Sequence, residues 1–343
     1  MAHQEKNLPV RNIRSSLKQT VYYVVIFFLG LICMYGISNF TQTKKSIEET
    51  YLIRKPSTNK LIAPLLLGGD NNNFYEEDLF SKTISNYIAH AIKDGDAQNI
   101  SYYFKNLTTG TWTGVNENEH YAPASLMKVP VMIAIFRQAE SDPSILKKEL
   151  LYTGASDLNK EEYYKPQKYI IAGNSYTVEK LVDYMIMYSD NNATALLLSI
   201  TSKNNLTEIF TDLGLPVPSD ATTGTLDYMS DKLYSRLFRV LYNSTYLNEE
   251  YSIKALEILS YSDFPAGIVT GIPKEISVAS KFGERTIYRE DTSVNYRELH
   301  DCVIVYLTKN PYLVCIMTKG NDFKKLEGVI QHISDLTYHA MKK

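Results

Sequence analysis

The spacing of apolar residues along the chain predicts mostly helices in its first and middle parts. Apolar residues three and four positions apart between Leu79 and Ile92 indicate an amphipathic helix. Most of residues 124–260 follows the same helical period. The clearest segments in this region are Val178–Tyr188, Leu206–Leu213, Ser230–Tyr242 and Glu249–Leu259, and a further helix is expected over Asn192–Ile200. A last amphipathic helix is predicted over Asp322–Met341.

Short apolar runs bounded by turn residues predict strands on both sides of this helical region. A hairpin should join Ile100–Leu107 to Trp112–Val115 through a Thr-Thr-Gly turn. A second hairpin should join Leu299–Leu307 to Tyr312–Thr318, and a further strand is expected over Ser277–Phe282. This order predicts an α+β fold, in which one antiparallel sheet assembled from both ends of the chain is flanked by helices.

The longest uncharged stretch lies near the start of the chain, over Thr20–Ser38. As a helix it would span roughly 28 Å, close to the hydrocarbon thickness of a bilayer. Basic residues are denser before it than after it, so the N-terminus is expected in the cytoplasm and the rest of the chain outside. The run is longer than the apolar region of a cleaved signal peptide, although Gly36 and Ser38 would suit cleavage. A retained single-pass transmembrane helix is therefore favoured.

This segment divides the chain into four predicted regions. Residues 1–19 are expected to form a cytoplasmic N-terminus, 20–38 the membrane anchor, 39–75 a polar linker or stalk, and 76–343 one domain.

The composition of the whole chain excludes some classes of function. With 36 basic and 38 acidic residues the net charge is −2, which argues against nucleic-acid binding. Only three cysteines occur, so a cysteine-rich zinc module is excluded.

The first candidate for chemistry is Ser125, which lies three residues before Lys128. On a helix this spacing places the hydroxyl and the amine on one face. A partly desolvated lysine loses affinity for its proton and can deprotonate the serine. Three other Ser-x-x-Lys matches occur, but only Ser125 opens a strongly apolar helix, Val129–Phe136.

Two later motifs strengthen this candidate. Ser189-Asp190-Asn191 lies between two predicted helices, and Lys281-Phe282-Gly283 lies on a predicted strand. Either motif alone has an ordinary explanation, a helix cap for the first and an exposed strand lysine for the second. In this order the three motifs resemble the penicillin-recognising serine hydrolases, specifically class A β-lactamases and related D,D-peptidases. The resemblance covers roughly residues 80–343 and implies an antiparallel sheet with helices on both faces and an all-helical insertion.

The resemblance also implies roles for individual residues. Ser125 would be the nucleophile that forms an acyl-enzyme, and Lys128 would accept its proton. Ser189 would relay a proton to the leaving nitrogen, and Lys281 would tune Ser189 and attract the substrate carboxylate. The backbone N–H groups of Ser125 and of Glu284, which follows Gly283, would form the oxyanion hole. Asn191 would contact the substrate amide, and Asp190 would be structural. No metal or organic cofactor is implied.

The chain departs from the family pattern at two places. The stretch 214–227, which corresponds to the loop that carries the deacylating glutamate of class A β-lactamases, contains no glutamate. Asp220 is a shorter substitute. Phe282 replaces the hydroxyl residue that binds the substrate carboxylate in the family, so Arg285 or Arg236 would have to supply that contact.

These departures leave three functions open. The favoured one is a membrane-anchored, bacterial serine hydrolase with a monomeric catalytic domain outside the cell membrane, which is acylated by β-lactams and deacylates slowly. The alternatives are a D-alanyl-D-alanine peptidase acting on cell-wall peptides and a penicillin-binding or sensor module without turnover.

Cys302 and Cys315 lie on the two arms of the last hairpin. Register counted from a Lys309-Asn310 turn sets Cys315 opposite Ile304, which favours two buried free thiols over a disulfide.

Overall fold

A computed structural model describes residues 52–68, 81–217 and 227–342, together with Tyr22, Phe27 and Met34. Nearly all of these residues belong to the larger of two units, Thr50–Lys343. The predicted anchor over 20–38, apart from the three residues named, lies outside the described residues. Within the described ranges, no helix is long and apolar enough to cross a membrane.

Five antiparallel strands form the central sheet in the order β4-β3-β9-β8-β7. Two strands precede the helical region and three follow it, which confirms the predicted sheet built from both ends of the chain. The strand bounds are Asn99–Asn106 for β3, Trp112–Val115 for β4, Val278–Tyr288 for β7, Val294–Val305 for β8 and Tyr312–Gly320 for β9.

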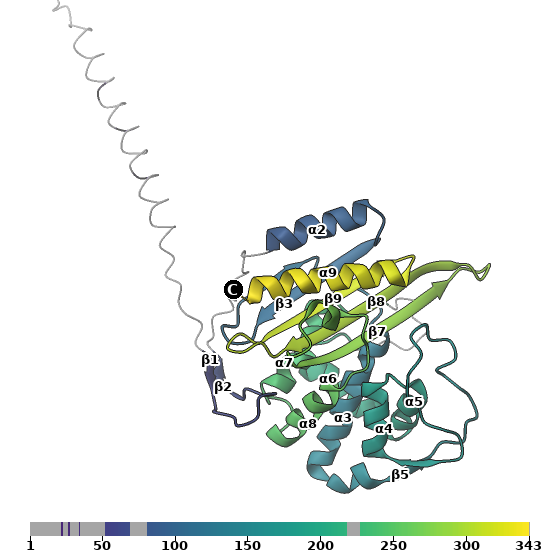
Figure 1. Cartoon of the computed structure of the whole chain (residues 1–343). Helices are drawn as coiled ribbons and strands as arrows, with labels where there is room; N and C mark the ends of the chain where they lie inside the picture. Colours follow the sequence, from purple (N-terminus) through teal and green to yellow (C-terminus); the bar gives the residue numbers. More distant parts are fainter. Residues whose placement is uncertain are drawn as a thin grey trace, which may run out of the picture. The chain divides into compact units, whose positions relative to one another are not determined.

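Alternation along the strands directs apolar side chains to both faces of this sheet. In β9, Tyr312, Val314 and Ile316 join one core, which α2 (Ser81–Lys93) and α9 (Phe323–Met341) complete. The intervening Leu313, Cys315 and Met317 join the other core, beneath the helical region. Figure 1 shows α2 and α9 on one side of the sheet and α3 to α8 on the other. Because both faces are covered, β3 and β9 are almost wholly buried.

The helical region confirms the predicted helices to within a few residues. Most of them begin at a side-chain cap, as at Thr177, Asp190, Ser202, Ser230 and Asn248, whose oxygen atoms accept backbone N–H groups of the first turn. The bounds are Lys128–Ser141 for α3, Val178–Met187 for α4, Asn191–Ile200 for α5, Lys203–Asp212 for α6, Asp231–Tyr242 for α7 and Glu249–Ser260 for α8. Short 3₁₀ turns are η1 (Ala124–Met127), η2 (Pro143–Lys147) and η3 (Ile268–Gly271).

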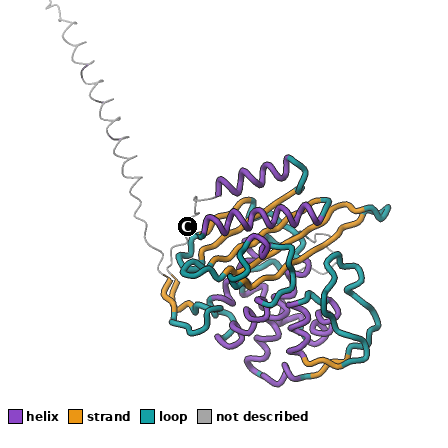
Figure 2. The backbone as a smooth tube through the Cα atoms, viewed as in Figure 1, coloured by secondary structure: helices purple, strands orange, loops and turns teal. Residues whose placement is uncertain are grey.

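A long loop over residues 152–174 leaves the helical region between β5 (Glu149–Leu151) and β6 (Ser175–Thr177), two strands that pair with each other. Figure 2 shows this loop as an extended excursion without helix or strand. Its hydrogen bonds to α5 and β7 fix it beside the motif residues.

Residues 52–68 were expected to be part of a linker, but they form a strand pair within the larger unit. Here β1 (Leu52–Arg54) and β2 (Leu65–Gly68) form an antiparallel pair. The Arg54 guanidinium donates hydrogen bonds to the side-chain oxygen of Asn243 at 2.9 Å and to the carbonyl of Leu107 at 2.9 Å. Polar composition suggested a solvated stalk, but these bonds and the buried Ile62 attach the segment to the domain.

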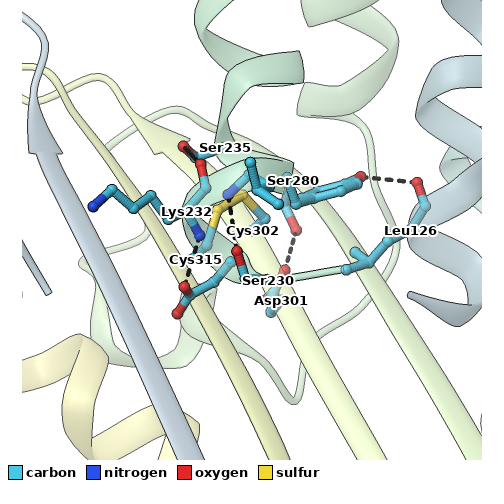
Figure 3. The surroundings of a disulfide bond; sticks show 11 residues. Leu126, Ser230, Lys232, Ser235, Ser280, Asp301, Cys302 and Cys315 are labelled. Carbon is cyan, nitrogen blue, oxygen red and sulfur yellow. Dashed lines mark hydrogen bonds between the residues drawn. A yellow bond between two sulfur atoms is a disulfide. The ribbon is translucent and has the colours of Figure 1, made fainter. Parts of the chain in front are cut away.

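Cys302 and Cys315 form a disulfide between β8 and β9, so the prediction of free thiols was wrong. The two cysteines are directly opposite in the register, because Val305 pairs with Tyr312 and the connection spans residues 306–311. The predicted turn at Lys309-Asn310 had displaced this register by two residues. Figure 3 shows the disulfide beside Ser230 and Ser235 at the start of α7. Both cysteines belong to the core between the sheet and the helical region.

A thiol titration tests the disulfide directly. Unfolded but unreduced full-length protein should show one reactive thiol, that of Cys33, and three after reduction. The two cysteines are 13 positions apart in the sequence. Because the bond closes this short loop in the unfolded chain, its reduction should lower the free energy of unfolding in urea by roughly 3 kcal/mol. Three thiols in the unreduced protein would contradict the pairing.

Candidate active site

Ser125 and Lys128 lie at the junction of a 3₁₀ turn and a helix. Ser125 is within η1, and Lys128 is the first residue of α3, so the single helical turn expected from the spacing is divided between two elements. The two side chains nevertheless meet, as their spacing in the sequence predicts. The Lys128 Nζ atom lies 2.8 Å from Ser125 Oγ.

Lys128 reaches from Ser125 to the turn between α4 and α5. Its Nζ atom lies 2.7 Å from the carbonyl oxygen of Ser189, 3.0 Å from Ser189 Oγ and 2.7 Å from Asn191 Oδ1. Only 3% of Lys128 is exposed. A neutral amine has two hydrogens and one lone pair. It can therefore donate to the carbonyl of Ser189 and to Asn191 while accepting the Ser125 hydroxyl proton.

Ser189 adopts a backbone conformation that its residue type rarely occupies. Its φ angle is +59°, in the left-handed region that costs a non-glycine residue roughly 1 kcal/mol or more. This conformation turns both the carbonyl and the hydroxyl of Ser189 toward Lys128 Nζ. From the other side, Lys281 Nζ on β7 donates to Ser189 Oγ at 3.0 Å and to the carbonyl of Phe282 at 3.0 Å. Ser189 thus lies between two buried amines.

Burial shapes the proton affinity of both lysines. Desolvation lowers the pKa of Lys128 to about 8, against the opposing attraction of Glu162, Asp190 and Glu284. Desolvation, and after it the nearby Lys128, holds the pKa of Lys281 well below its usual range. Both amines therefore favour the uncharged form more than an exposed lysine does.

Asp190 fastens the site and the long loop together. Its Oδ1 atom accepts the backbone N–H of Asn192 at 2.8 Å and the side-chain amide of Asn159 at 2.9 Å, and its Oδ2 atom accepts the N–H of Ile170 at 2.8 Å. Asn159 in turn accepts the backbone N–H of Asn191 at 2.8 Å. Asp190 is fully buried, which agrees with the structural role expected of it.

Gly283 permits the close approach of β7 to η1. A Cβ atom at this position would lie 2.8 Å from the carbonyl oxygen of Pro123 and 3.1 Å from the nitrogen of Leu126. Only glycine fits without moving one element, and the approach brings Glu284 beside Ser125. Both residues line one cavity of about 400 Å³. The other lining residues are Ala124, Met127, Lys128, Val131, Glu162, Asn191, Thr194, Leu198, Leu206 and Arg285.

The structure distinguishes the residues considered for the substrate carboxylate. The Phe282 ring stacks on Phe264 with centroids 3.9 Å apart, in the core between the sheet and α9. Arg236 donates to the carbonyls of Leu213 and Gly214 at 2.8 and 2.9 Å and does not line the cavity. Arg285 lines the cavity, and it has no ion-pair partner among the described residues. Asp220 lies outside the described residues.

Glu162 and Tyr164 are site residues that the sequence did not reveal. The Glu162 carboxylate accepts a hydrogen bond from Asn191 Nδ2, and the backbone N–H of Tyr164 donates to Glu284 Oε1 at 2.6 Å. Burial first, and then the charge of Glu162 and a side-chain hydrogen bond with it, raise the pKa of Glu284 to about 8. Glu162 and Tyr164 both come from the long loop, whose sequence has neither a periodic pattern nor a motif.

An antiparallel sheet with a helical insertion, and a Ser-Lys-Ser-Lys cluster where they meet, define a class A β-lactamase-type serine hydrolase. The model of the beta-lactamase enzyme family matches residues 80–341, so the chain belongs to this family. No curated protein matches the chain.

Solved structures agree on the fold. PBP-A is 20% identical with a TM-score of 0.63, over 78% of this chain and 97% of its own. A mutant of PBP-A, solved as an acyl-enzyme complex with penicillin G, is 18% identical with a TM-score of 0.64, over 78% and 98%. A class A β-lactamase from Mycobacterium abscessus is 18% identical with a TM-score of 0.63, over 76% and 100%. At these identities the likeness concerns the fold.

The hydrogen bonds of Asp190 lead to a prediction about the long loop. Asp190→Asn replaces one carboxylate oxygen by a donor that faces Asn159 or the N–H of Ile170. The free energy of unfolding in urea should fall by about 2 to 3 kcal/mol, and limited proteolysis should cut within residues 152–174 sooner. Glu161→Gln, at an exposed position of the same loop, is the control and should cost about 0.5 kcal/mol or less. Equal costs for the two variants would contradict the anchoring role of Asp190.

Proposed function

We propose that this protein is a serine hydrolase that is acylated at Ser125 by β-lactam amides and deacylates slowly. One observation carries the proposal: the buried Lys128 Nζ atom lies within 3.0 Å of both Ser125 Oγ and Ser189 Oγ. A nucleophile, its base and a second hydroxyl are thus in contact, which is the arrangement that covalent acyl transfer needs.

The acylation step follows from these contacts. The neutral amine of Lys128 takes the hydroxyl proton as Ser125 Oγ attacks the amide carbonyl. The backbone N–H groups of Ser125 and Glu284 stabilise the oxyanion. The Ser189 hydroxyl, held by Lys281, passes its proton to the nitrogen as the C–N bond breaks, and it takes from Lys128 the proton that Lys128 removed from Ser125. Arg285 is the cavity residue that we assign to the substrate carboxylate, in place of the hydroxyl that Phe282 lacks.

Slow deacylation is proposed from the missing glutamate. Hydrolysis of the acyl-enzyme needs a base that activates water, and the stretch 214–227 has no glutamate. No described residue of this stretch lines the cavity. A base displaced by about 1 Å can already cost roughly a hundredfold in rate.

The location of the enzyme is also a proposal. We infer that residues 20–38 anchor the protein in a bacterial cell membrane with the catalytic domain outside. The support is the uncharged stretch itself and the denser basic residues before it. Cell-wall peptides and β-lactams occur on that side of the membrane.

A D-alanyl-D-alanine peptidase is the second candidate, because the glutamate that deacylates class A β-lactamases is absent. It would use the same acyl-enzyme at Ser125. A penicillin-binding module without turnover is the third, and it would be acylated but would release no product.

Mass spectrometry after brief exposure to penicillin G tests the acyl-enzyme. The intact protein should gain the mass of the drug at Ser125, and the adduct should persist for minutes or longer. Ser125→Ala should gain none, while Ser144→Ala, in another Ser-x-x-Lys match remote from the cavity, should be labelled normally.

The remaining outcomes separate the three candidates. Rapid loss of the adduct with turnover of a chromogenic cephalosporin would contradict slow deacylation. Release of D-alanine from a D-alanyl-D-alanine peptide would support the peptidase. The absence of any adduct on folded protein would refute Ser125 as a nucleophile.

The pKa of Lys128 predicts the pH dependence of acylation. Only the neutral amine can accept a proton, so below a pKa of about 8 the rate should fall nearly tenfold per pH unit. Above it the rate should level off. Labelling by a fluorescent penicillin between pH 5.5 and 9.5 measures the profile. Lys128→Arg, which stays protonated, should be slower by about a hundredfold or more and lack the inflection. An unchanged inflection in that variant would assign it to another group.

A further inference from the structure

The cavity beside Ser125 continues beyond the motif residues into an apolar end. Both α3 and α5 begin at motif residues, α3 at Lys128 and α5 at Asn191. The next lining residues of each helix come one to two turns later, which places them about 5 to 10 Å further along the helix axes. The residues that form this apolar end are Val131 on α3, Thr194 and Leu198 on α5, Met127 of η1 and Leu206 on α6.

Among the described residues that line it, the apolar end offers a ligand no free side-chain donor. The Thr194 hydroxyl donates to the carbonyl of Asp190 at 2.7 Å. The sulfur of Met127 accepts the hydroxyl of Tyr228 at 3.3 Å. The other three side chains are hydrocarbon. A polar substituent placed here would lose its bonds to water without replacement, whereas an apolar one would gain from leaving water.

The exposure of Leu198 shows that protein does not fill this end. Leu198 is 44% exposed, while Ala193 and Leu197 of the same helix are fully buried. A single exposed leucine is ordinary on a protein surface, but this one lines the cavity of about 400 Å³ that also contains Ser125. A cavity of this volume is within the range that holds small-molecule ligands.

The two contacts proposed for a β-lactam direct the rest of the molecule toward the apolar end. Its scissile carbonyl lies at Ser125, and its carboxylate, on the side of the leaving nitrogen, binds Arg285. Arg285 belongs to β7, and this strand meets the start of α5 through the hydrogen bond of Lys281 to Ser189. The acyl substituent is attached to the other side of the scissile carbonyl. It therefore extends away from β7, along α3 and α5.

We propose that the apolar end is a binding subsite for an apolar substituent of the acyl group, such as a phenyl ring. Leu198 is a specificity-determining residue of this subsite, because it is the exposed member of the five. The inference names the class of acyl donor and rests on the proposed acylation of Ser125. Penicillin G, whose side chain ends in a phenyl ring, belongs to the favoured class.

A competition between two penicillins tests the subsite. Penicillin G has a phenylacetyl side chain, and 6-acetamidopenicillanic acid differs from it only by lacking the phenyl ring, which is remote from the reacting bond. The full chain is exposed briefly to both compounds in equal excess. Intact-mass spectrometry then gives the ratio of the two adducts, which equals the ratio of their second-order rate constants for acylation. Penicillin G should be favoured at least tenfold, because its phenyl ring leaves water in the subsite.

Variants of the lining leucines connect this preference with the subsite. Leu198→Ser and Leu206→Ser each remove apolar contact area, so each should lower the preference at least threefold. Leu151→Ser, at an exposed leucine that does not line the cavity, should keep the wild-type ratio. Circular dichroism checks that each variant is folded. A general disturbance of the site would slow both acylations and leave their ratio unchanged.

The outcomes separate this inference from the proposed function. Equal adducts in the wild-type protein, or a preference that persists in both Leu198→Ser and Leu206→Ser, would refute the subsite while Ser125 remains the nucleophile. If neither penicillin labels Ser125, the proposed function fails, and this inference fails with it.

Discussion

The candidate site depends on one constraint, the burial of the Lys128 amine beside Ser125. A charged ammonium taken out of water is costly unless its hydrogens are bound, and a neutral amine is the form that can act as a base. The structure provides acceptors on the side away from the nucleophile, namely the carbonyl of Ser189 and the amide oxygen of Asn191. The lone pair is left for Ser125. Most local features around the site serve to keep these acceptors in place.

The backbone near Lys128 shows how this is achieved. Ser189 is held at a positive φ angle because Asp190 caps α5 while its other oxygen atom binds the long loop. Gly283 allows β7 to lie against η1, which brings Lys281 to the same hydroxyl from the opposite side. Strain at Ser189 and close contact at Gly283 are tolerated because the two packed cores on either face of the sheet hold the elements rigidly.

The features that were predictable from the sequence were those carried by local spacing. Ser125 and Lys128 are three residues apart, so any helical turn brings them together, and Asp190 caps a helix because its side chain binds the next amides. Register and loops were harder. The pairing of Cys302 with Cys315 depends on where a six-residue connection turns, which composition does not determine. Glu162 reaches Asn191 across 29 positions of sequence through an irregular loop, so no periodicity could indicate it. The apolar anchoring of residues 52–68 was likewise hidden by polar neighbours.

The long loop has a consequence for the base itself. Burial alone would lower the proton affinity of Lys128 further, but Glu162, Asp190 and Glu284 each act against it. Glu162 belongs to the long loop, and Asp190 is hydrogen-bonded to it. Glu284 accepts the backbone N–H of Tyr164, which is also in the loop. The loop that binds the Asn191 amide therefore also affects the pH range in which Lys128 can accept a proton. One residue of this loop, Glu162, thus both binds the Asn191 amide and acts on the base of Ser125. A substrate that changes the position of Glu162 must also change the charge environment of Lys128 at the moment when that amine is needed as a base.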